Sequence, residues 1–473
     1  MGRGYAQGPA PGPAREINSI SKNMMMSRTE KDRYPCRALG HKNSDERPMT
    51  EPGSADTKKF QTTDPHYFDD SVRFITTLAK AIDRYGGHSH DMDRTLLHVI
   101  RTLGLNGEIL ATPSSRTIAI WQNHTDYQTI HIATSKDPVY DMTRLEWTRD
   151  LIDDVEAGRT SPAEGLKRLR EIGQAPPLYT NPAKAVAFFL AGAGFGALMG
   201  ISWLEILIGG ALGIIACGIE MQVVKIPQFE HAREVVISLL IAVLASLIAA
   251  GVPGIHIVAV TVCALTIYIP GFGITIAPRE IIMGETLSGI IYFMNALVVC
   301  VKLLIGTILG IGIVQYVLPA AAAGPLNGVS PVLVWAFIPF LLISNGILFG
   351  VSPSRFWLLI ICGLLLWAGL QAGNTLGFWQ GFFLGAIILT VYARIAANRF
   401  RTTLSTILLP AVLMLVPGYD FIQALYLLNT GGVVAGIGAM FQVFGIIGAV
   451  ICGVFVGEII GSFSRMERPE PAD

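Results

Sequence analysis

Ten long apolar segments, which begin at Ala183, constrain this chain more than any other feature. Each is near the roughly 17 to 25 residues that a helix needs to cross a bilayer core of about 30 Å. The segments lie near 184–200, 203–219, 235–251, 254–270, 289–316, 331–349, 356–370, 376–393, 402–417 and 433–461. The chain is 51% hydrophobic and only 15% charged, which is too apolar for a typical soluble protein. The sequence therefore predicts an α-helical integral membrane protein with ten transmembrane helices in the lipid bilayer.

Basic residues between the segments indicate their orientation, because short cytoplasmic loops accumulate Lys and Arg. With a cytoplasmic N-terminus, the inside connections hold Lys225, Arg233, Arg279, Arg355, Arg394, Arg399, Arg401, Arg465 and Arg468. The outside connections hold no basic residue. This segregation predicts ten spans with both termini cytoplasmic. We expect the membrane to be a plasma (inner) membrane.

A repeat divides the membrane part into two halves. Pro270-Gly271-Phe272 and Pro417-Gly418-Tyr419 each end an apolar segment and are 147 residues apart (417 − 270). Broken hydrophobic segments of this kind are a sequence pointer to the binding site of a transporter. Each half has five spans, an odd number, so the repeat is predicted to be inverted. We expect its two breaks to fall at opposite membrane faces.

The predicted organisation has five parts. They are a disordered tail at 1–60, a small soluble α+β domain at 61–182, membrane halves at 183–330 and 331–465, and a C-terminal tail at 466–473. The first tail is rich in Gly, Pro and mixed charge, and cannot bury enough apolar surface to offset its ordering entropy. The soluble domain shows helical periods near 72–82, 92–103, 143–157 and 162–172, and short strands near 108–112, 117–122 and 128–134. Its predicted element order is ααβββαα.

Polar residues follow both breaks. After the first break, the apolar run contains Thr275, Arg279, Glu280 and Glu285. This stretch is either a re-entrant, cavity-lining segment or an amphipathic interfacial loop, and both interpretations stay open. After the second break, Asp420 is either a proton acceptor or a helix cap at the external surface.

Three further polar residues lie deep in apolar segments. Lys302 is near the middle of 289–316, where an exposed charge costs several kcal/mol, so we expect it to face a cavity or a partner. It would bind a substrate carboxylate or carry a coupling proton, with snorkelling to the interface as the alternative. Asn295 and Gln442 also differ by 147 (442 − 295) and either bind a zwitterion together or join helices. Glu205 is expected to stay hydrated near the surface.

Other chemistries lack a recognisable pattern in this sequence. The six cysteines show no CxxC or Cys/His ligand spacing, and the histidines before the first span come without a ligand frame such as HExxH. We therefore expect no metal and no cofactor. The 35 basic and 35 acidic residues form no basic stripe, which argues against a nucleic-acid partner. A membrane-tethered hydrolase and a non-transporting sensor stay open as other classes, and a homo-oligomer stays open too.

Four ordered blocks between about Phe68 and Ile460 follow one family pattern. They are DMDRTLLHVIRTLGLNGEILATPSSRTIAI, VEAGRTSPAEGLKRLREI, ALTIYIPGFGITIAPREIIMGETLSG and LLPAVLMLVPGYDFIQALYLLNTGG. On these blocks the chain resembles the threonine/serine exporter family, in its fused form with a soluble N-terminal domain and ten membrane spans. Glu280 departs from the family pattern, in which we expect Asp.

The resemblance implies a secondary exporter of small hydrophilic metabolites, above all threonine and serine, driven by the proton gradient. A related split form is associated with export of dicarboxylates such as succinate, so a dicarboxylate stays open as the alternative substrate. No GxxxxGK[ST] motif for ATP occurs, which favours coupling to a gradient. The implied partner is a small-molecule substrate, and no enzyme activity is implied.

Overall fold

The structure is a computed structural model that describes most of the chain after the first 64 residues. It covers residues 65–463 apart from 87–89, 113–114, 123–127, 135–138, 272, 274–276, 278–279, 282–285, 319–327 and 430–431. The expected tails at 1–60 and 466–473 lie outside the described residues.

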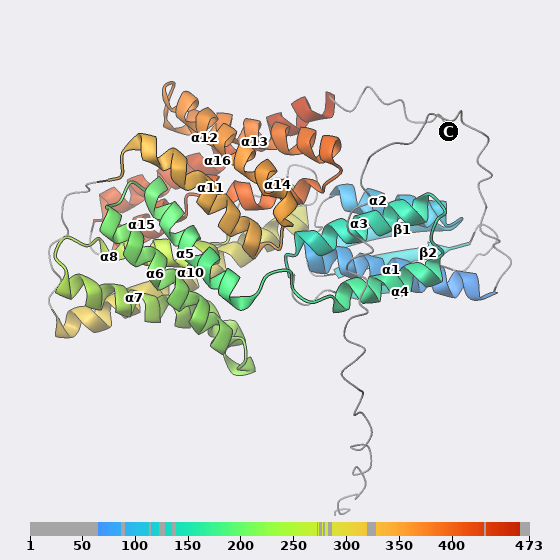
Figure 1. Cartoon of the computed structure of the whole chain (residues 1–473), viewed down its shortest axis with the longest axis horizontal. Coiled ribbons are helices and arrows are strands. Elements are labelled where there is room, and N and C mark those ends of the chain that lie inside the picture. Colours follow the sequence, from blue (N-terminus) through green and yellow to red (C-terminus); the bar gives the residue numbers. More distant parts are fainter. Residues whose placement is uncertain are drawn as a thin grey trace, which may run out of the picture. The chain divides into compact units, whose positions relative to one another are not determined.

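The N-terminal part of the described chain is a small α+β domain (Figure 1). Its elements are α1 (Pro65–Tyr85), α2 (His90–Thr102), β1 (Asn106–Thr112), β2 (Ser115–Trp121), β3 (Thr129–Thr134), α3 (Met142–Glu156) and α4 (Pro162–Gln174). The order ααβββαα predicted from the sequence is confirmed. The strands form an antiparallel sheet in the order β1-β2-β3, in which Ile109 pairs with Ile118 and Ile118 with His131.

Alternation in β2 and helical periodicity in α1 build the core of this domain. Ile118 and Ile120 point to the same side of the sheet and are fully buried, together with Phe74 and Leu78 of α1. Ser161 is the N-cap of the last helix, because its hydroxyl accepts a hydrogen bond from the N–H of Glu164 at 3.3 Å.

The rest of the described chain is helical. Its elements are α5 (Asn181–Leu198), α6 (Trp203–Val223), η2 (Pro227–Ala232), α7 (Arg233–Gly251), α8 (Ile257–Leu265), η3 (Thr266–Tyr268), α10 (Thr286–Val317), α11 (Pro331–Leu348), η4 (Pro353–Arg355), α12 (Phe356–Asn374), α13 (Phe378–Phe400), α14 (Leu404–Val412), η5 (Leu413–Leu415), α15 (Gly418–Asn429) and α16 (Val433–Phe463). Among the described residues, eight helical stretches are long and apolar enough to cross a membrane. The first and fourth expected segments, which correspond to α5 and α8, are not among these eight.

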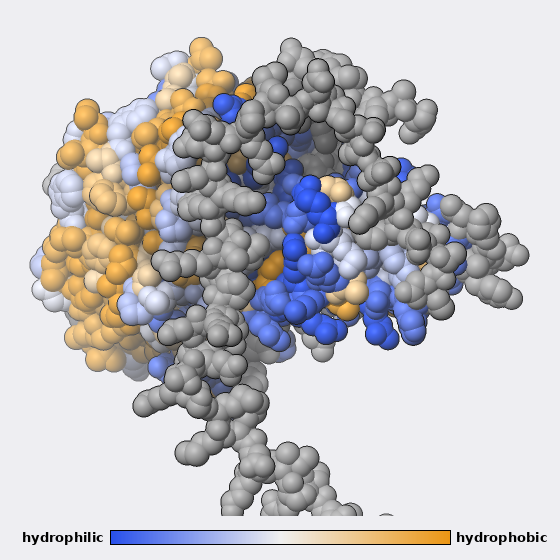
Figure 2. Space-filling view, turned by 45° about the vertical axis from the view of Figure 1, so that its right-hand side comes forward, coloured by the Kyte–Doolittle hydropathy of each residue, from blue (hydrophilic) through white to orange (hydrophobic). Residues whose placement is uncertain are grey.

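Hydrophobic residues cover much of the surface of these helices. In Figure 2 they gather in a broad area of the visible face, beside an area of hydrophilic residues. Exposed apolar side chains run along α10, for example at Ile290, Val298, Ile305 and Ile313. A soluble protein rarely exposes such a continuous apolar surface, whereas a surface in contact with lipid requires one.

Glycines bring α7 and α10 together along their length. A Cβ atom on Gly306 would meet Ser238, and one on Gly310 would meet Ala242 within 3 Å. The contact four residues later in α10 is with a residue four residues later in α7, so the two helices run in the same direction. Small residues at such positions let two helix backbones approach closely.

The second half repeats this packing. Gly453 and Gly457, which are 147 residues beyond Gly306 and Gly310, bring α16 against Ala386 and Thr390 of α13. Here too the contacts advance together, so α13 and α16 run in the same direction. The offset seen in the Pro-Gly breaks therefore extends to how the helices pack.

Candidate functional site: two broken helices in contact

Both Pro-Gly steps interrupt a helix in the same way. The first interruption follows α8 and η3, and the second follows α14 and η5; α14 spans 404–412, which is α8 (257–265) shifted by 147. At each break the glycine N–H bonds back to the carbonyl two residues earlier, Gly271 to Ile269 at 2.7 Å and Gly418 to Val416 at 2.8 Å. Proline explains the interruption, because it lacks an N–H and disfavours helical geometry in the residue before it.

A helix resumes directly after each break. The second break continues into α15, and after the first break the described residues 271, 273, 277, 280 and 281 are helical. Ala277 and Glu280 are buried. Gly273 is half-buried and Ile281 is exposed, so the described part of this stretch is a helical segment with a buried side and an exposed side. The prediction that the ninth segment ends at Pro417 is wrong, because α15 extends it.

The two breaks touch each other. A Cβ atom on Gly271 would lie 2.5 Å from Val416, and one on Gly418 would lie 2.7 Å from Ile269. Ile269 and Val416 are themselves 147 residues apart (416 − 269), so each break contacts the other through equivalent residues. Both side chains are buried in one apolar cluster. The expectation that the breaks fall at opposite membrane faces is therefore wrong; they meet at one junction, which we call the break junction (Ile269–Gly271 with Val416–Gly418).

The break junction gathers helix N-termini. The first turn of a helix has N–H groups without intrahelical partners and carries a partial positive charge. The helices that resume at Gly271 and Gly418 both begin here, which makes the junction suited to an anionic group. Asp420 lies in the first turn of α15 and is half-buried, whereas the equivalent position of the first half is Gly273 (420 − 147). Asp420 lies two residues after Gly418 of the junction.

Lys302 lies elsewhere, in an ion pair between α7 and α10. Its Nζ is 3.4 Å from Oε2 of Glu234, whose Oε1 is 3.2 Å from Arg233. Glu234 is buried and is the partner that an intramembrane lysine requires. Lys302 thus faces a protein partner, and its charge is already paired.

The two amides do not form one site in the described residues. Asn295 on α10 and Gln442 on α16 are both exposed, and α10 packs chiefly against α7 while α16 packs chiefly against α13. Of the other polar residues near the first break, Glu280 is buried, and Thr275, Arg279 and Glu285 lie outside the described residues. The candidate site therefore reduces to the break junction with Asp420.

Sequence reasoning missed a carboxylate beside the first break. Tyr268, the residue before Ile269, donates a hydrogen bond from its hydroxyl to Oε2 of Glu220 on α6 at 2.8 Å. The two residues are 48 apart in the chain, and no periodicity relates them. The only available signals were an acidic residue near the end of an apolar span and a tyrosine next to the break.

Glu205 is also placed differently from expectation. It is 1% exposed, so the expectation that it stays hydrated is wrong. Its Oε2 accepts hydrogen bonds from the N–H and hydroxyl of Ser202 at 2.9 and 2.7 Å, and its Oε1 accepts one from the N–H of His256 at 2.7 Å. These bonds satisfy the carboxylate within the protein.

Two family models match the chain. One describes a ThrE threonine/serine exporter and matches residues 73–314, and the other, described as Threonine/Serine exporter, ThrE, matches residues 333–460. The chain is also similar to the uncharacterized protein C16A10.01 of Schizosaccharomyces pombe, with 23% identity over 392 residues. That alignment covers 79% of this chain and 45% of the relative, so the chain spans less than half of the relative's length. No solved structure matches the chain.

Proposed function

The chain belongs to the threonine/serine exporter family, and on that premise we propose that it is a proton-coupled secondary exporter of threonine and serine. The observation that carries this proposal is the break junction, where two repeat-related helix breaks meet. The site would lie in the plasma membrane, with both termini cytoplasmic.

The proposed topology is ten spans in an inverted 5+5 repeat. Eight described stretches have the length and apolarity of a span. We count α5 as the first span, and α8 with the helical residues after Gly271 as the fourth. In this topology the third and fifth spans run in the same direction, which the contacts of α7 with α10 support. The eighth and tenth, α13 and α16, are related in the same way.

Charge at the break junction favours an amino acid over a dicarboxylate. The two helix N-termini would receive the substrate carboxylate. Asp420 would receive the ammonium group in the same site. A dicarboxylate would instead bring its second negative charge toward Asp420, and like charges at close range repel. The alternative substrate, a dicarboxylate such as succinate, is therefore less well matched.

We assign proton coupling to Glu220 and its bond with Tyr268. Protonation of Glu220 would neutralise the acceptor of the hydrogen bond from the Tyr268 hydroxyl. This bond would weaken, because a hydrogen bond to a charged group is roughly twice as strong as a neutral one. Tyr268 adjoins the first break, so this change reaches the break junction directly. The equivalent positions of the second half, Trp367 (220 + 147) and Leu415 (268 + 147), carry no ionisable group. Coupling would then belong to one half only.

Reconstitution of the full chain in proteoliposomes tests the proposal. We expect exchange of labelled threonine and serine but not succinate, and acceleration by an imposed pH gradient. Asp420→Asn should raise the KM for threonine roughly thirtyfold, because losing one partner of a buried charge pair costs about 2 kcal/mol or more. Glu164→Gln in α4 is the control and should behave like the parent protein.

The other outcomes are distinct. Exchange of succinate without threonine or serine would establish the dicarboxylate alternative. Absence of flux for all three compounds would favour a sensor. An unchanged KM in Asp420→Asn would remove Asp420 from the site while leaving the exporter function intact.

A further inference from the structure

The first half contains a carboxylate that joins the beginnings of two helices. Glu205 of α6 bonds to Ser202, the N-cap of α6, and to the N–H of His256, the N-cap of α8. Since α8 leads to the first break, Glu205 holds the start of the broken helix against its neighbour.

The second half has no carboxylate of its own at the equivalent place. A shift of 147 turns Glu205 into Ser352 and His256 into Thr403. Thr403 is the N-cap of α14, which leads to the second break. The second half therefore has a counterpart of α8 but no counterpart of Glu205. Ser352 is a neutral residue whose hydroxyl lies 3.0 Å from that of Ser354.

Glu146 of the α+β domain occupies this position from outside the repeat. Its Oε1 accepts hydrogen bonds from the hydroxyls of Thr402 and, at 3.4 Å, Thr406. Its Oε1 is also 3.9 Å from Nε of Arg355, the N-cap of α12. One carboxylate again lies between the first turns of two helices, here α12 and α14. We propose that Glu146 is a positioning residue of the transporter, by which the α+β domain completes the second half as Glu205 completes the first.

Other contacts fix Glu146 in this place. The N–H groups of Met142 and Thr143 donate to the carbonyls of Phe349 and Gly350 at 2.9 and 3.0 Å, in the connection between α11 and η4. A guanidinium nitrogen of Arg149 donates to the carbonyl of Thr402 at 3.3 Å. Residues of α3 on both sides of Glu146 therefore bind the two connections that Glu146 bridges.

The positioning role is sensitive to protonation. Burial raises the pKa of Glu146, the Thr402 hydroxyl and Arg355 act in the opposite direction, and Asp150 adds to the rise. The groups that face Glu146 are Asp150 from α3, Arg355 from η4, and the two threonines from the start of α14. A protonated Glu146 loses its attraction to Arg355 and part of its capacity as a hydrogen-bond acceptor. The hydrogen bonds from the start of α14 to Glu146 would therefore weaken as the pH on the side of the α+β domain falls.

Hydrogen exchange of the purified full chain tests this inference without using transport. In Glu146→Gln, we expect the amides of 402–412 to exchange about tenfold faster or more, because a charge-assisted buried bond is lost. The equivalent amides of 255–265, which Glu205 holds, should not change. Thr402→Val should act in the same direction as Glu146→Gln.

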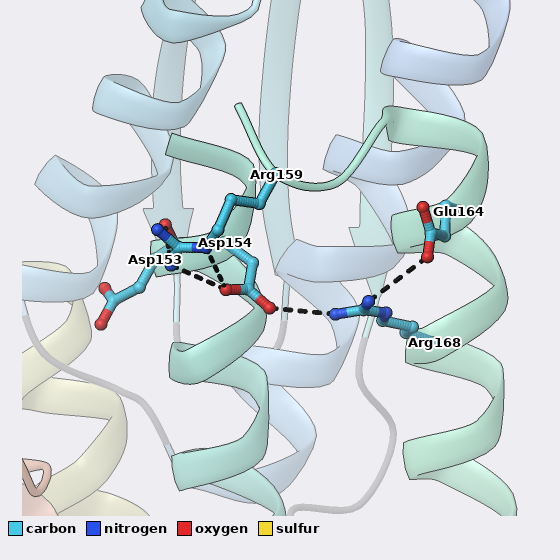
Figure 3. A network of polar contacts seen from close by, with 5 residues as sticks. All are labelled: Asp153, Asp154, Arg159, Glu164 and Arg168. Carbon is cyan, nitrogen blue, oxygen red and sulfur yellow. Dashed lines mark hydrogen bonds and ion pairs between the residues drawn. The ribbon is translucent and has the colours of Figure 1, made fainter. Parts of the chain in front are cut away.

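The matched control is Glu164→Gln. Glu164 belongs to a polar network inside the same domain, in which Arg168 bridges Glu164 and Asp154 at 3.3 and 2.9 Å, and Asp154 also pairs with Arg159 (Figure 3). This variant should leave exchange at 402–412 unchanged.

A second readout is the dependence of substrate exchange on the pH of the α+β domain side, which should flatten in Glu146→Gln and return in Glu146→Asp. Unchanged exchange at 402–412 in both Glu146→Gln and Thr402→Val would overturn the inference. A parent protein that moves neither threonine nor serine would overturn the proposed function alone, because the hydrogen-exchange result stands apart from it.

Discussion

Gly271 and Gly418 let the two breaks meet, because neither has a side chain to separate them. Gly418→Val places its Cβ atom about 2.7 Å from Ile269, which is closer than van der Waals contact, and such overpacking costs about 1–3 kcal/mol. We expect a lower melting temperature and loss of threonine exchange. Gly438→Val is the matched control, since no described atom lies within 4 Å of the position of a Cβ there. Equal behaviour of the two variants in thermal unfolding and exchange would contradict contact at the break junction.

Asp83 in α1 makes stability depend on pH. Burial raises its pKa to about 6, against the lowering effect of Arg116, while Asp93 adds to the rise. Because the pKa is higher in the folded state than in the unfolded one, protonation of Asp83 stabilises the fold at low pH. That contribution is lost as pH rises from about 4 to about 6.

The test is the melting temperature of the full chain between pH 4 and pH 7. Asp83→Asn should reduce the fall in melting temperature across this window. Asp69→Asn, on the exposed side of the same helix, should keep the profile of the parent. If Asp83→Asn leaves the slope unaltered, Asp83 does not titrate as described.

At the scale of elements, the Tyr268 hydroxyl joins the first break to α6, through a hydrogen bond to Glu220 at 2.8 Å and a longer one to the carbonyl of Ala216 at 3.4 Å. We expect Glu220→Gln and Tyr268→Phe to keep threonine exchange at equal pH on both sides. Both should lose accumulation driven by a pH gradient, because protonation of Glu220 would no longer reach the break. Tyr316→Phe removes a hydroxyl from an exposed tyrosine of α10 and should accumulate threonine like the parent. Gradient-driven accumulation by Glu220→Gln would exclude Glu220 as the coupling residue.

Most elements could be predicted from local patterns. The seven elements of the α+β domain were predicted in order, and the helical period near 162–172 matches α4. Caps and hydrophobic periods are properties of neighbouring residues, so one sequence is enough to read them. The helices after both breaks were harder, because a Pro-Gly step predicts an end and does not say whether a helix resumes.

The position of a polar residue within an apolar segment does not identify the residue that it contacts. Lys302 was expected to face a cavity or partner, but Glu234 could not be named, because the pair joins α7 and α10 across 68 residues. Asn295 and Gln442 have equivalent positions, yet equivalence by repeat does not make two side chains neighbours. Tyr268 and Glu220 were missed for the same reason.

At the scale of the whole molecule, apolar segment length and the 147-residue offset were enough to predict a membrane protein built from two related halves. These properties are local or periodic, and the bilayer thickness and the helix rise convert them into structure. Only the tertiary structure revealed that the two breaks touch and that Glu146 contacts the residues at the start of α14. Both are contacts between residues more than 140 positions apart, and their formation depends on how helices pack, which no local pattern encodes.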